Sequence, residues 1–221
     1  MSGALDVQLC DRLLTTTRSL RKRLDLTKDV PTEIIEECLD IAVQSPTGTN
    51  TQKWHFVVVR NSDKRKQVAE IYKKAFELYW ADIKKAERNT QTQPLSTENK
   101  RMFESARYLA DHLGKVPVLL IFCLEEDMRD MSPFHQATAY GSVLPAAWSF
   151  MLAARARGLG SCWTTLHLKY AFDVSTLLGI PDTVTQCVLL PVAYSTVAEL
   201  KVAKRSPAKD VTHWDCWNGQ K

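Results

Sequence analysis

Three separated segments of the chain carry side chains suited to one anionic, hydrogen-bonding ligand. The first is "TRSLRKR", where Arg18, Ser19 and Arg21 place two guanidinium groups and a hydroxyl close together. A guanidinium donates two parallel hydrogen bonds to a phosphate, so this spacing is typical of phosphate binding. The alternative interpretation is a solvated basic turn between two helices.

The second segment is "SPTGTNTQKWHF", which combines a rigid proline with glycine, hydroxyl and amide groups. Thr47, Thr49 and Asn50 can each donate and accept hydrogen bonds. Gly48 allows a ligand to approach the backbone closely. The same residues also suit a helix C-cap followed by a turn, and the sequence leaves both interpretations open.

The third segment is "VAKRSPAKD", where Lys204 and Arg205 precede a Ser-Pro pair in a stretch of low apolar content. An exposed basic tail is the alternative here. A fourth segment, "GLGSCWTT", invites comparison with a dinucleotide-binding fingerprint. We exclude that interpretation because the glycines follow a predicted helix and the third glycine is missing. The segment instead predicts a tight turn with accessible backbone N–H groups and two threonines.

Composition limits the classes of partner. The net charge of +4 is mild and the basic residues are spread out, so we expect no nucleic-acid partner. No run approaches the ~20 apolar residues of a membrane-spanning helix, and the first residues resemble no secretory signal. We therefore expect a cytoplasmic protein with no membrane partner. The six cysteines form no C-x-x-C pair, so we expect mostly buried free thiols and no metal site.

Apolar periodicity predicts one α+β domain over residues 1–221. Helices are expected over 4–16, 31–45, 63–88, 98–113 and 134–157, the last kinked or split by Pro145. Asn61 to Asp63 read as a turn, and a polar loop is expected over 88–99. Strands are expected over 53–60 and 185–195, with a central strand in "VPVLLIFCLEE" that is covered on both faces.

The order of these segments resembles the nitroreductase family of FMN-dependent oxidoreductases, over residues of about 15 to 215. "RSLR", "SPTGTNTQKWHF", "GLGSCWTT" and "KRSP" together carry the resemblance. The resemblance implies a mostly antiparallel central sheet flanked by helices, in an intertwined homodimer with FMN at the interface. It also implies a variable helical lid region at about 63–113 and a C-terminal arm at about 196–221, although the aromatic stripe of residues 72–80 equally suits ordinary core.

The resemblance also assigns cofactor roles. The Arg-Ser-x-Arg element and the late basic pair would bind the FMN phosphate, the loop would contact the flavin ring, and the Gly-rich turn would lie beside N5. The implied cofactor-binding residues are Arg18, Ser19, Arg21, Pro46, Thr47, Gly48, Asn50, Gln52, Trp163, Thr164, Thr165, Lys204 and Arg205. Thr17, Leu24 and Lys53 depart from the family pattern, and Lys53 could reach solvent or the nicotinamide donor.

The chemistry implied is transfer of electrons from NAD(P)H through bound FMN to a small flat acceptor, such as a nitroaromatic or a quinone, with ping-pong kinetics. We therefore expect no catalytic acid or base from the chain. His55 is interpreted as an edge or packing residue, and His167 as a helix-cap or surface residue. The alternatives are a flavin-dependent dehydrogenation or dehalogenation on the same fold, and a non-catalytic flavin-binding dimer.

Overall fold

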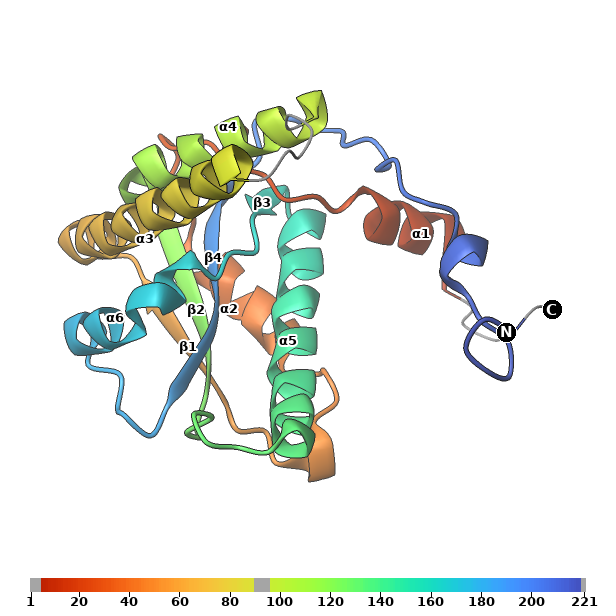
Figure 1. Ribbon diagram of the computed structural model, residues 1–221. Helices are drawn as coiled ribbons and strands as arrows, with labels where there is room; N and C mark the ends of the chain where they lie inside the picture. The colour runs from red at the N-terminus through yellow and green to blue at the C-terminus, as the bar shows by residue number, and fades with distance from the viewer. Residues whose placement is uncertain (1–4, 90–95, 220–221) are drawn as a thin grey trace.

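The computed structural model describes residues 5–89 and 96–219, in which one sheet lies between two layers of helices (Figure 1). The strands are β1 (Trp54–Val59), β2 (Val118–Leu124), β3 (Leu159–Ser161) and β4 (Thr185–Tyr194). The helices are α1 (Val7–Thr16), α2 (Thr32–Ala42), α3 (Ser62–Asn89), α4 (Thr97–His112), α5 (Pro133–Ala156) and α6 (Ala171–Leu178). Short 3₁₀ turns are η1 (Gly48–Asn50), η2 (Leu113–Lys115), η3 (Leu166–Tyr170) and η4 (Ala208–Val211).

The sheet has the order β1-β2-β4-β3, and all three neighbouring pairs run antiparallel. The predicted α+β class with an antiparallel sheet is confirmed. Every residue of β2 is buried, as expected for a central strand covered on both faces. Side chains alternate along β2, so that Leu120 and Phe122 enter one core while Leu119 and Ile121 enter the other.

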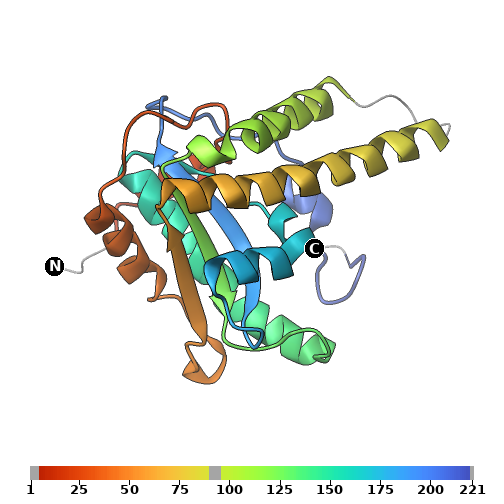
Figure 2. The ribbon, with the colours of Figure 1, turned by 90° about the vertical axis from the view of Figure 1, so that its left-hand side faces the viewer.

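Helices α2 and α5 pack on one face of the sheet, and α3, α4 and η3 pack on the opposite face (Figure 2). The α5 face holds Ile35, Val143 and Phe150 among other apolar side chains. The α3 face holds Tyr72 and Phe76. The sheet therefore separates two hydrophobic cores, and a side chain at the edge of the sheet can contact either core.

Helix α5 is continuous through Pro145, so the predicted split does not occur. Proline removes one backbone hydrogen bond and commonly costs about 3 kcal/mol inside a helix. Its neighbours Val143, Ala146 and Ala147 are buried in the core, and we attribute the intact helix to this packing. Tertiary burial contributes more to a helix in a protein than local propensity does.

The start of α3 corrects a second prediction. Ser62 already belongs to the helix, and the predicted turn at Asn61 is its N-cap. The Asn61 side-chain oxygen accepts hydrogen bonds from the backbone N–H groups of Asp63 at 3.1 Å and Lys64 at 3.0 Å. The long helix expected after it is confirmed. Of the polar loop predicted at 88–99, residues 90–95 lie outside the described residues.

Helix α1 and the C-terminal segment project together from the body of the molecule (Figure 1). Arg12 pairs with Glu199 at 3.1 Å, and Arg155 donates a long hydrogen bond of 3.4 Å to the Ala198 carbonyl. We call α1 together with residues 196–219 the arm. Within residues 5–89 and 96–219, no helix combines the length and apolar character needed to cross a membrane.

Candidate functional site

The structure brings the Arg-Ser element against the Gly-rich turn. The backbone N–H of Leu20 donates to the Ser161 carbonyl at 2.8 Å, and Ser19 and Ser161 pair as a short parallel bridge. Gly160 permits this contact, since a Cβ added there would lie 2.6 Å from Leu20 Cδ1. Two segments far apart in sequence thus form one unit, and we call Arg18–Arg21 with Gly160–Thr165 the phosphate-end cluster.

Beneath the surface of this cluster lies a set of buried polar groups. Tyr72 from α3 hydrogen-bonds Thr164, with 2.9 Å between the two hydroxyl oxygens. Burial raises the pKa of Tyr72 to about 12. Burial also raises the pKa of the Cys162 thiol, while the positive charge of Arg21 and hydrogen bonds to Ser19 and Arg21 oppose that rise. Both cysteine and tyrosine are therefore neutral at physiological pH.

The exposed side of the cluster is cationic. Arg18 and Arg21 are half-buried, and Ser19 is exposed. Among the described residues, neither guanidinium pairs with a carboxylate. Two guanidinium groups and a hydroxyl left open in this way fit an anionic ligand, and phosphate most closely because its oxygens accept paired N–H donors. The phosphate-binding role of these residues stays a prediction.

The second predicted segment forms a strained loop. Thr49, Asn50 and Gln52 have φ of 50°, 56° and 50°, in the left-handed region that side-chain-bearing residues seldom adopt. The Gln52 amide donates to Asn50 Oδ1 at 3.2 Å, and its backbone N–H donates to Thr47 Oγ1 at 3.3 Å. Backbone strain of this kind concentrates at ligand-binding sites. We call residues 46–53 the flavin loop, after its predicted role.

The flavin loop is fastened to α5 rather than to the helix before it. Helix α2 ends at Ala42, so Gly48 is not its C-cap, and that alternative is wrong. The Gly48 N–H donates to Ser142 Oγ at 3.0 Å. A Cβ on Gly48 would lie 2.7 Å from Thr138 Cγ2. Glycine here therefore serves a close approach to the helix and not a positive φ.

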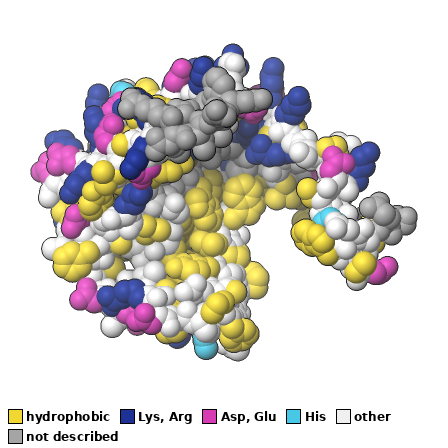
Figure 3. Space-filling model, in the orientation of Figure 1, with side chains coloured by type: hydrophobic (Ala, Val, Ile, Leu, Met, Phe, Trp, Pro, Cys, Tyr) yellow, Lys and Arg dark blue, Asp and Glu magenta, His cyan; other side chains and the backbone are white. Residues whose placement is uncertain are grey.

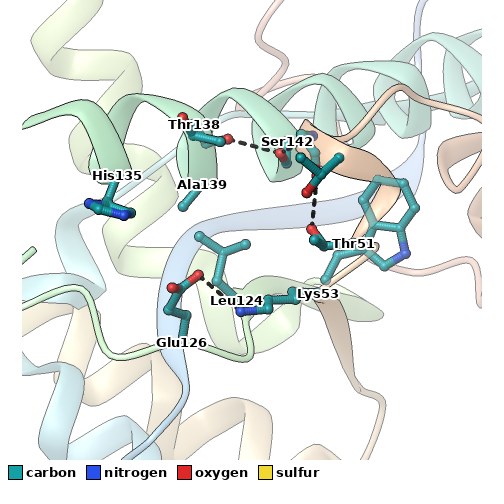
Figure 4. A pocket seen from close by; sticks show the side chains of 11 residues that line it. Thr51, Lys53, Leu124, Glu126, His135, Thr138, Ala139 and Ser142 are labelled. Atoms are coloured by element: carbon teal, nitrogen blue, oxygen red, sulfur yellow. Dashed lines mark hydrogen bonds and ion pairs between the residues drawn. The ribbon is translucent and has the colours of Figure 1, made fainter.

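A cavity of about 160 Å³ lies between the flavin loop, the end of β2 and the first half of α5 (Figure 4). Lys53 and Glu126 face each other across it, with 3.7 Å between Nζ and Oε2. Thr51, Thr138 and the Ser142 hydroxyl contribute polar groups to the same space. The lysine that departs from the family pattern thus forms an ion pair at this cavity instead of extending freely into solvent.

The phosphate-end cluster and the flavin loop lie at opposite ends of α5 in one chain (Figure 1). The loop contacts Ser142, whereas β3 follows the C-terminal end of the helix near Ala156. At about 1.5 Å per residue this segment of helix spans roughly 20 Å. Among the described residues, no hydrogen bond or ion pair joins the two halves of the predicted site.

The remaining predicted residues have mixed positions. Trp163 is half-buried against the α5-side core, and Thr165 is exposed. Lys204 and Arg205 are exposed. Arg205 donates a hydrogen bond to the neighbouring Lys204 carbonyl at 3.4 Å. Among the described residues, it forms no hydrogen bond to the phosphate-end cluster. The structure does not unite this late basic pair with Arg18 and Arg21.

The histidines divide in an unexpected way. His55 is exposed on β1, 3.3 Å from Glu125, in agreement with an edge position. His167 was expected at the surface or in a cap, and that prediction is wrong because η3 packs against α3 and buries it completely. Neither ring nitrogen has a hydrogen-bond partner among the residues that the structure describes, and burial lowers the pKa of His167 to about 4. Within the described parts of the chain, no group of His, Cys, Asp and Glu could hold a metal ion.

Apolar side chains are exposed on α5 and on the arm. A hollow separates the arm from the body, and hydrophobic side chains gather along it (Figure 3). On α5, Phe134 is 74% and Trp148 39% exposed, and in the arm Trp217 is 81% exposed. Helix α5 buries Val143 and Phe150 in the core and also exposes the apolar side chains Phe134 and Trp148. A large exposed apolar surface of this kind is typical of a protein–protein interface.

The contacts of Tyr72, Cys162 and Ser142 with the candidate site were not predicted. Each reaches a site residue through a contact between distant parts of the chain, such as the 92-residue separation of Tyr72 and Thr164. The aromatic stripe on α3 signalled that Tyr72 would be buried, but not that its hydroxyl would meet a threonine. All six cysteines are free, four of them buried, in agreement with the expectation of mostly buried thiols.

Comparison with known proteins identifies relatives. The Nitroreductase family model matches residues 14–194. A Methanothermobacter thermautotrophicus protein, a putative NADH dehydrogenase/NAD(P)H nitroreductase, is 26% identical over 183 residues, covering 82% of this chain and 74% of that protein. Iodotyrosine deiodinase 1 of Rattus norvegicus is 26% identical over 194 residues, covering 86% of this chain and 64% of the deiodinase. This chain thus spans less than two thirds of the rat enzyme.

The fold is shared with solved structures. A crystal structure of oxidized iodotyrosine deiodinase bound to FMN and 3-iodo-L-tyrosine has a TM-score of 0.69 and 20% sequence identity. The match covers 93% of this chain and 98% of that chain. The predicted nitroreductase-like fold is therefore confirmed.

Proposed function

Because this chain belongs to the nitroreductase family, we propose that it is an FMN-dependent oxidoreductase that carries electrons from NAD(P)H to a small flat acceptor, such as a nitroaromatic or a quinone. The observation that carries the proposal is the phosphate-end cluster. There, Ser19 and Leu20 are paired through the backbone with Ser161 of the Gly-rich turn, and among the described residues no carboxylate pairs with the neighbouring guanidinium groups of Arg18 and Arg21.

In this proposal the chain binds and orients the cofactor. Arg18 and Arg21 hold the phosphate, and Ser19 adds a hydroxyl donor. Thr164 and Thr165, on the adjoining turn, supply polar groups for the ring side of the cofactor. Bound FMN supplies the electron-transfer chemistry, while the protein sets its position and electrostatic surroundings. Lys204 and Arg205 would approach the phosphate only if the arm adopts another position or serves a second copy.

We further propose that the site is completed by a homodimer. The flavin loop lies at the opposite end of α5 from the phosphate-end cluster of its own chain, so a second copy would supply the loop to each site. The exposed apolar side chains of α5 and the arm support such an interface, and they include Phe134, Trp148 and Trp217. Pro46, Thr47, Gly48, Asn50 and Gln52 would then contact the ring from the second copy.

Reductive dehalogenation of a halogenated phenol is the second candidate. It is favoured by the similarity to iodotyrosine deiodinases, one of which was solved with 3-iodo-L-tyrosine. The cavity beside the flavin loop holds one cation and one anion, Lys53 and Glu126. That pair of charges suits an amino-acid-like substrate, which carries both a carboxylate and an ammonium group. A cytoplasmic location stays a prediction for either candidate.

The first experiment is the visible absorption spectrum of the purified protein, recorded without oxygen before and after addition of NADH or NADPH. A flavin band that bleaches with a nicotinamide donor, and returns with a quinone or nitroaromatic, supports the proposal. The second candidate is favoured if the flavin band resists both nicotinamide donors but bleaches with dithionite, and if the reduced protein then releases halide from a halophenol. A band that no acceptor restores indicates a flavin-binding dimer without catalysis. Absence of a band after incubation with FMN would overturn the proposal.

A further inference from the structure

One buried hydrogen bond joins the candidate site to α3. The Tyr72 hydroxyl lies 2.9 Å from Thr164 Oγ1, and either oxygen can act as the donor. Tyr72 is 2% exposed and Thr164 is 9% exposed, so water does not compete freely for this bond. In such surroundings a hydrogen bond is electrostatically stronger, and its loss leaves a polar group unsatisfied.

The backbone of Thr164 is fixed independently of Tyr72. Its N–H donates to the Leu189 carbonyl at 3.1 Å, and its carbonyl accepts from the Leu189 N–H at 2.9 Å. Both bonds anchor the residue to β4. The remaining rotational freedom is that of the side chain, and Tyr72 is the partner of that side chain on the α3 face. Removing the phenol oxygen would therefore free the threonine hydroxyl without releasing the turn.

A hydroxyl has one proton to donate, so the partner that donates to it decides where its own proton points. The phenol of Tyr72 remains protonated because burial disfavours its anion. When Tyr72 donates to Thr164 Oγ1, the threonine O–H is left to donate in another direction. Ser19 and Arg21 contact Cys162, which lies two residues before Thr164 on the same turn.

We propose that Tyr72 is a positioning residue, which holds the Thr164 hydroxyl so that its proton is available to the bound cofactor. This inference rests on the proposed function, because it assigns Thr164 to the cofactor. It makes α3 part of the site, although α3 belongs to the region expected to serve as a lid. A hydrogen-bond donor supplied to the cofactor stabilises the reduced, more electron-rich form more than the oxidised form.

The test compares Tyr72→Phe, Thr164→Val and the double variant, all purified with FMN. We expect Tyr72→Phe to weaken FMN binding about three- to tenfold in a fluorescence titration, as for loss of one hydrogen bond. We also expect a lower reduction potential of the bound flavin. The double variant should match Thr164→Val alone, because the two residues act through one hydroxyl. Thr164→Ser keeps the hydroxyl and should restore binding and potential.

Tyr194→Phe is the matched control, since it also removes one phenol oxygen, from a half-buried tyrosine on β4 whose ring contacts Lys28. It should leave both values unchanged. If Tyr72→Phe lowers the melting temperature of the apoprotein but changes neither FMN affinity nor potential, Tyr72 is structural and the inference is wrong. If Tyr72→Phe fails to fold, equal potentials in Thr164→Val and Thr164→Ser would contradict it. Wild-type protein that binds no FMN would instead overturn the proposed function as well.

Discussion

The two halves of the candidate site are built in different ways. The phosphate-end cluster is fixed by backbone hydrogen bonds between Leu20 and Ser161 and by a buried side-chain bond between Tyr72 and Thr164. The flavin loop is mostly exposed; it is attached to the rest of the chain through the Gly48 bond to Ser142, the Glu125 N–H bond to the Lys53 carbonyl and the lining of the cavity. Its strained residues Thr49 and Asn50 hold the left-handed conformation at the surface.

This difference indicates a division of labour. A rigid, partly buried half is preorganised to bind one end of a cofactor without a large ordering cost. An exposed and strained half presents its polar groups outward, where a second copy of the chain or a ligand can cover them. Mutations should therefore perturb folding at the phosphate end and perturb binding or assembly at the loop.

The largest expected effect is the acid sensitivity of the buried half. The pKa of His167 falls from 6.5 to about 4 on folding, so the unfolded chain binds a proton first as pH decreases. The contribution of His167 to the free energy of unfolding should be fully present above pH 6.5. It should fall by about 3 kcal/mol as the pH decreases toward 4. Denaturant titrations of wild type and His167→Leu across this range check the prediction.

His55→Leu is the control for loss of an imidazole, because His55 is exposed on β1 and its replacement should leave the free energy of unfolding close to that of wild type. An identical slope of stability against pH in wild type and His167→Leu would show that another group titrates. The phosphate end would then no longer differ from the flavin loop in its expected sensitivity to acid.

The next largest effect is expected on FMN affinity, when a charged residue of the phosphate-end cluster is compared with a neutral residue of the flavin loop. Arg21→Ala removes a charge-assisted phosphate contact and should weaken FMN binding by about 1.5–3 kcal/mol, which is on the order of 10- to 100-fold. Asn50→Ala removes a neutral amide and should cost roughly 0.5–1.5 kcal/mol. Fluorescence titration of FMN measures both. Equal losses would mean that the phosphate does not sit at the guanidinium groups.

The late basic pair can be examined in the same assay. The family resemblance implies that Arg205 binds the FMN phosphate, so Arg205→Ala would remove a charge-assisted contact. The structure keeps Arg205 exposed and away from the cluster. A 10- to 100-fold loss, of the order expected for a charged hydrogen bond, would show that the arm closes onto a phosphate site. Unchanged affinity would remove Arg205 from the site.

Gly160 and Gly48 allow the tightness of packing in the two halves of the site to be compared. Gly160→Ala places a methyl group against buried Leu20 and should destabilise the fold by about 1–3 kcal/mol. Gly48→Ala meets the methyl group of Thr138, which is exposed and can yield, so its cost should be smaller. Thermal unfolding compares them. The double variant Gly48→Ala/Thr138→Ser should recover the loss, and failure to do so would place the strain elsewhere in the loop.

The smallest effect is expected at the cavity ion pair. Lys53→Met breaks a 3.7 Å contact with Glu126 that is partly exposed to solvent. Such pairs contribute up to ~1 kcal/mol, so the melting temperature should change little. If the cavity takes a charged substrate, the same variant should raise its Michaelis constant while leaving stability intact. A large loss of stability would instead assign Lys53 a structural role.

Much of the fold was predictable because hydrophobic runs determine it locally. The run through β2 predicts a strand buried on both faces, and the apolar circumference of α5 predicts an interface or core helix. Packing overruled local rules at Pro145, where the helix continues. Residues 63–88 were predicted as a helix, but the capping role of Asn61 depended on a hydrogen-bond geometry that the sequence leaves open.

The candidate site was predictable in its residue types and not in its assembly. The guanidinium and hydroxyl residues of the phosphate end are recognisable in sequence, and the structure places Arg18 and Arg21 beside the predicted turn. The contact of Tyr72 with Thr164 and the burial of His167 both depend on how α3 packs, which no local pattern encodes. The separation of the flavin loop along α5 likewise follows from tertiary structure.

The projecting arm has a practical consequence for handling the protein. Helix α1 and the C-terminal segment are joined through the surface pair of Arg12 and Glu199, and a weak bond from Arg155 on α5 joins the C-terminal segment to the body. An isolated subunit would offer these exposed stretches to proteases, which cleave extended, poorly packed backbone first. A subunit covered by a second copy would shield them. The rate of trimming by trypsin, followed against protein concentration, thus reports the state of assembly before any ligand is known.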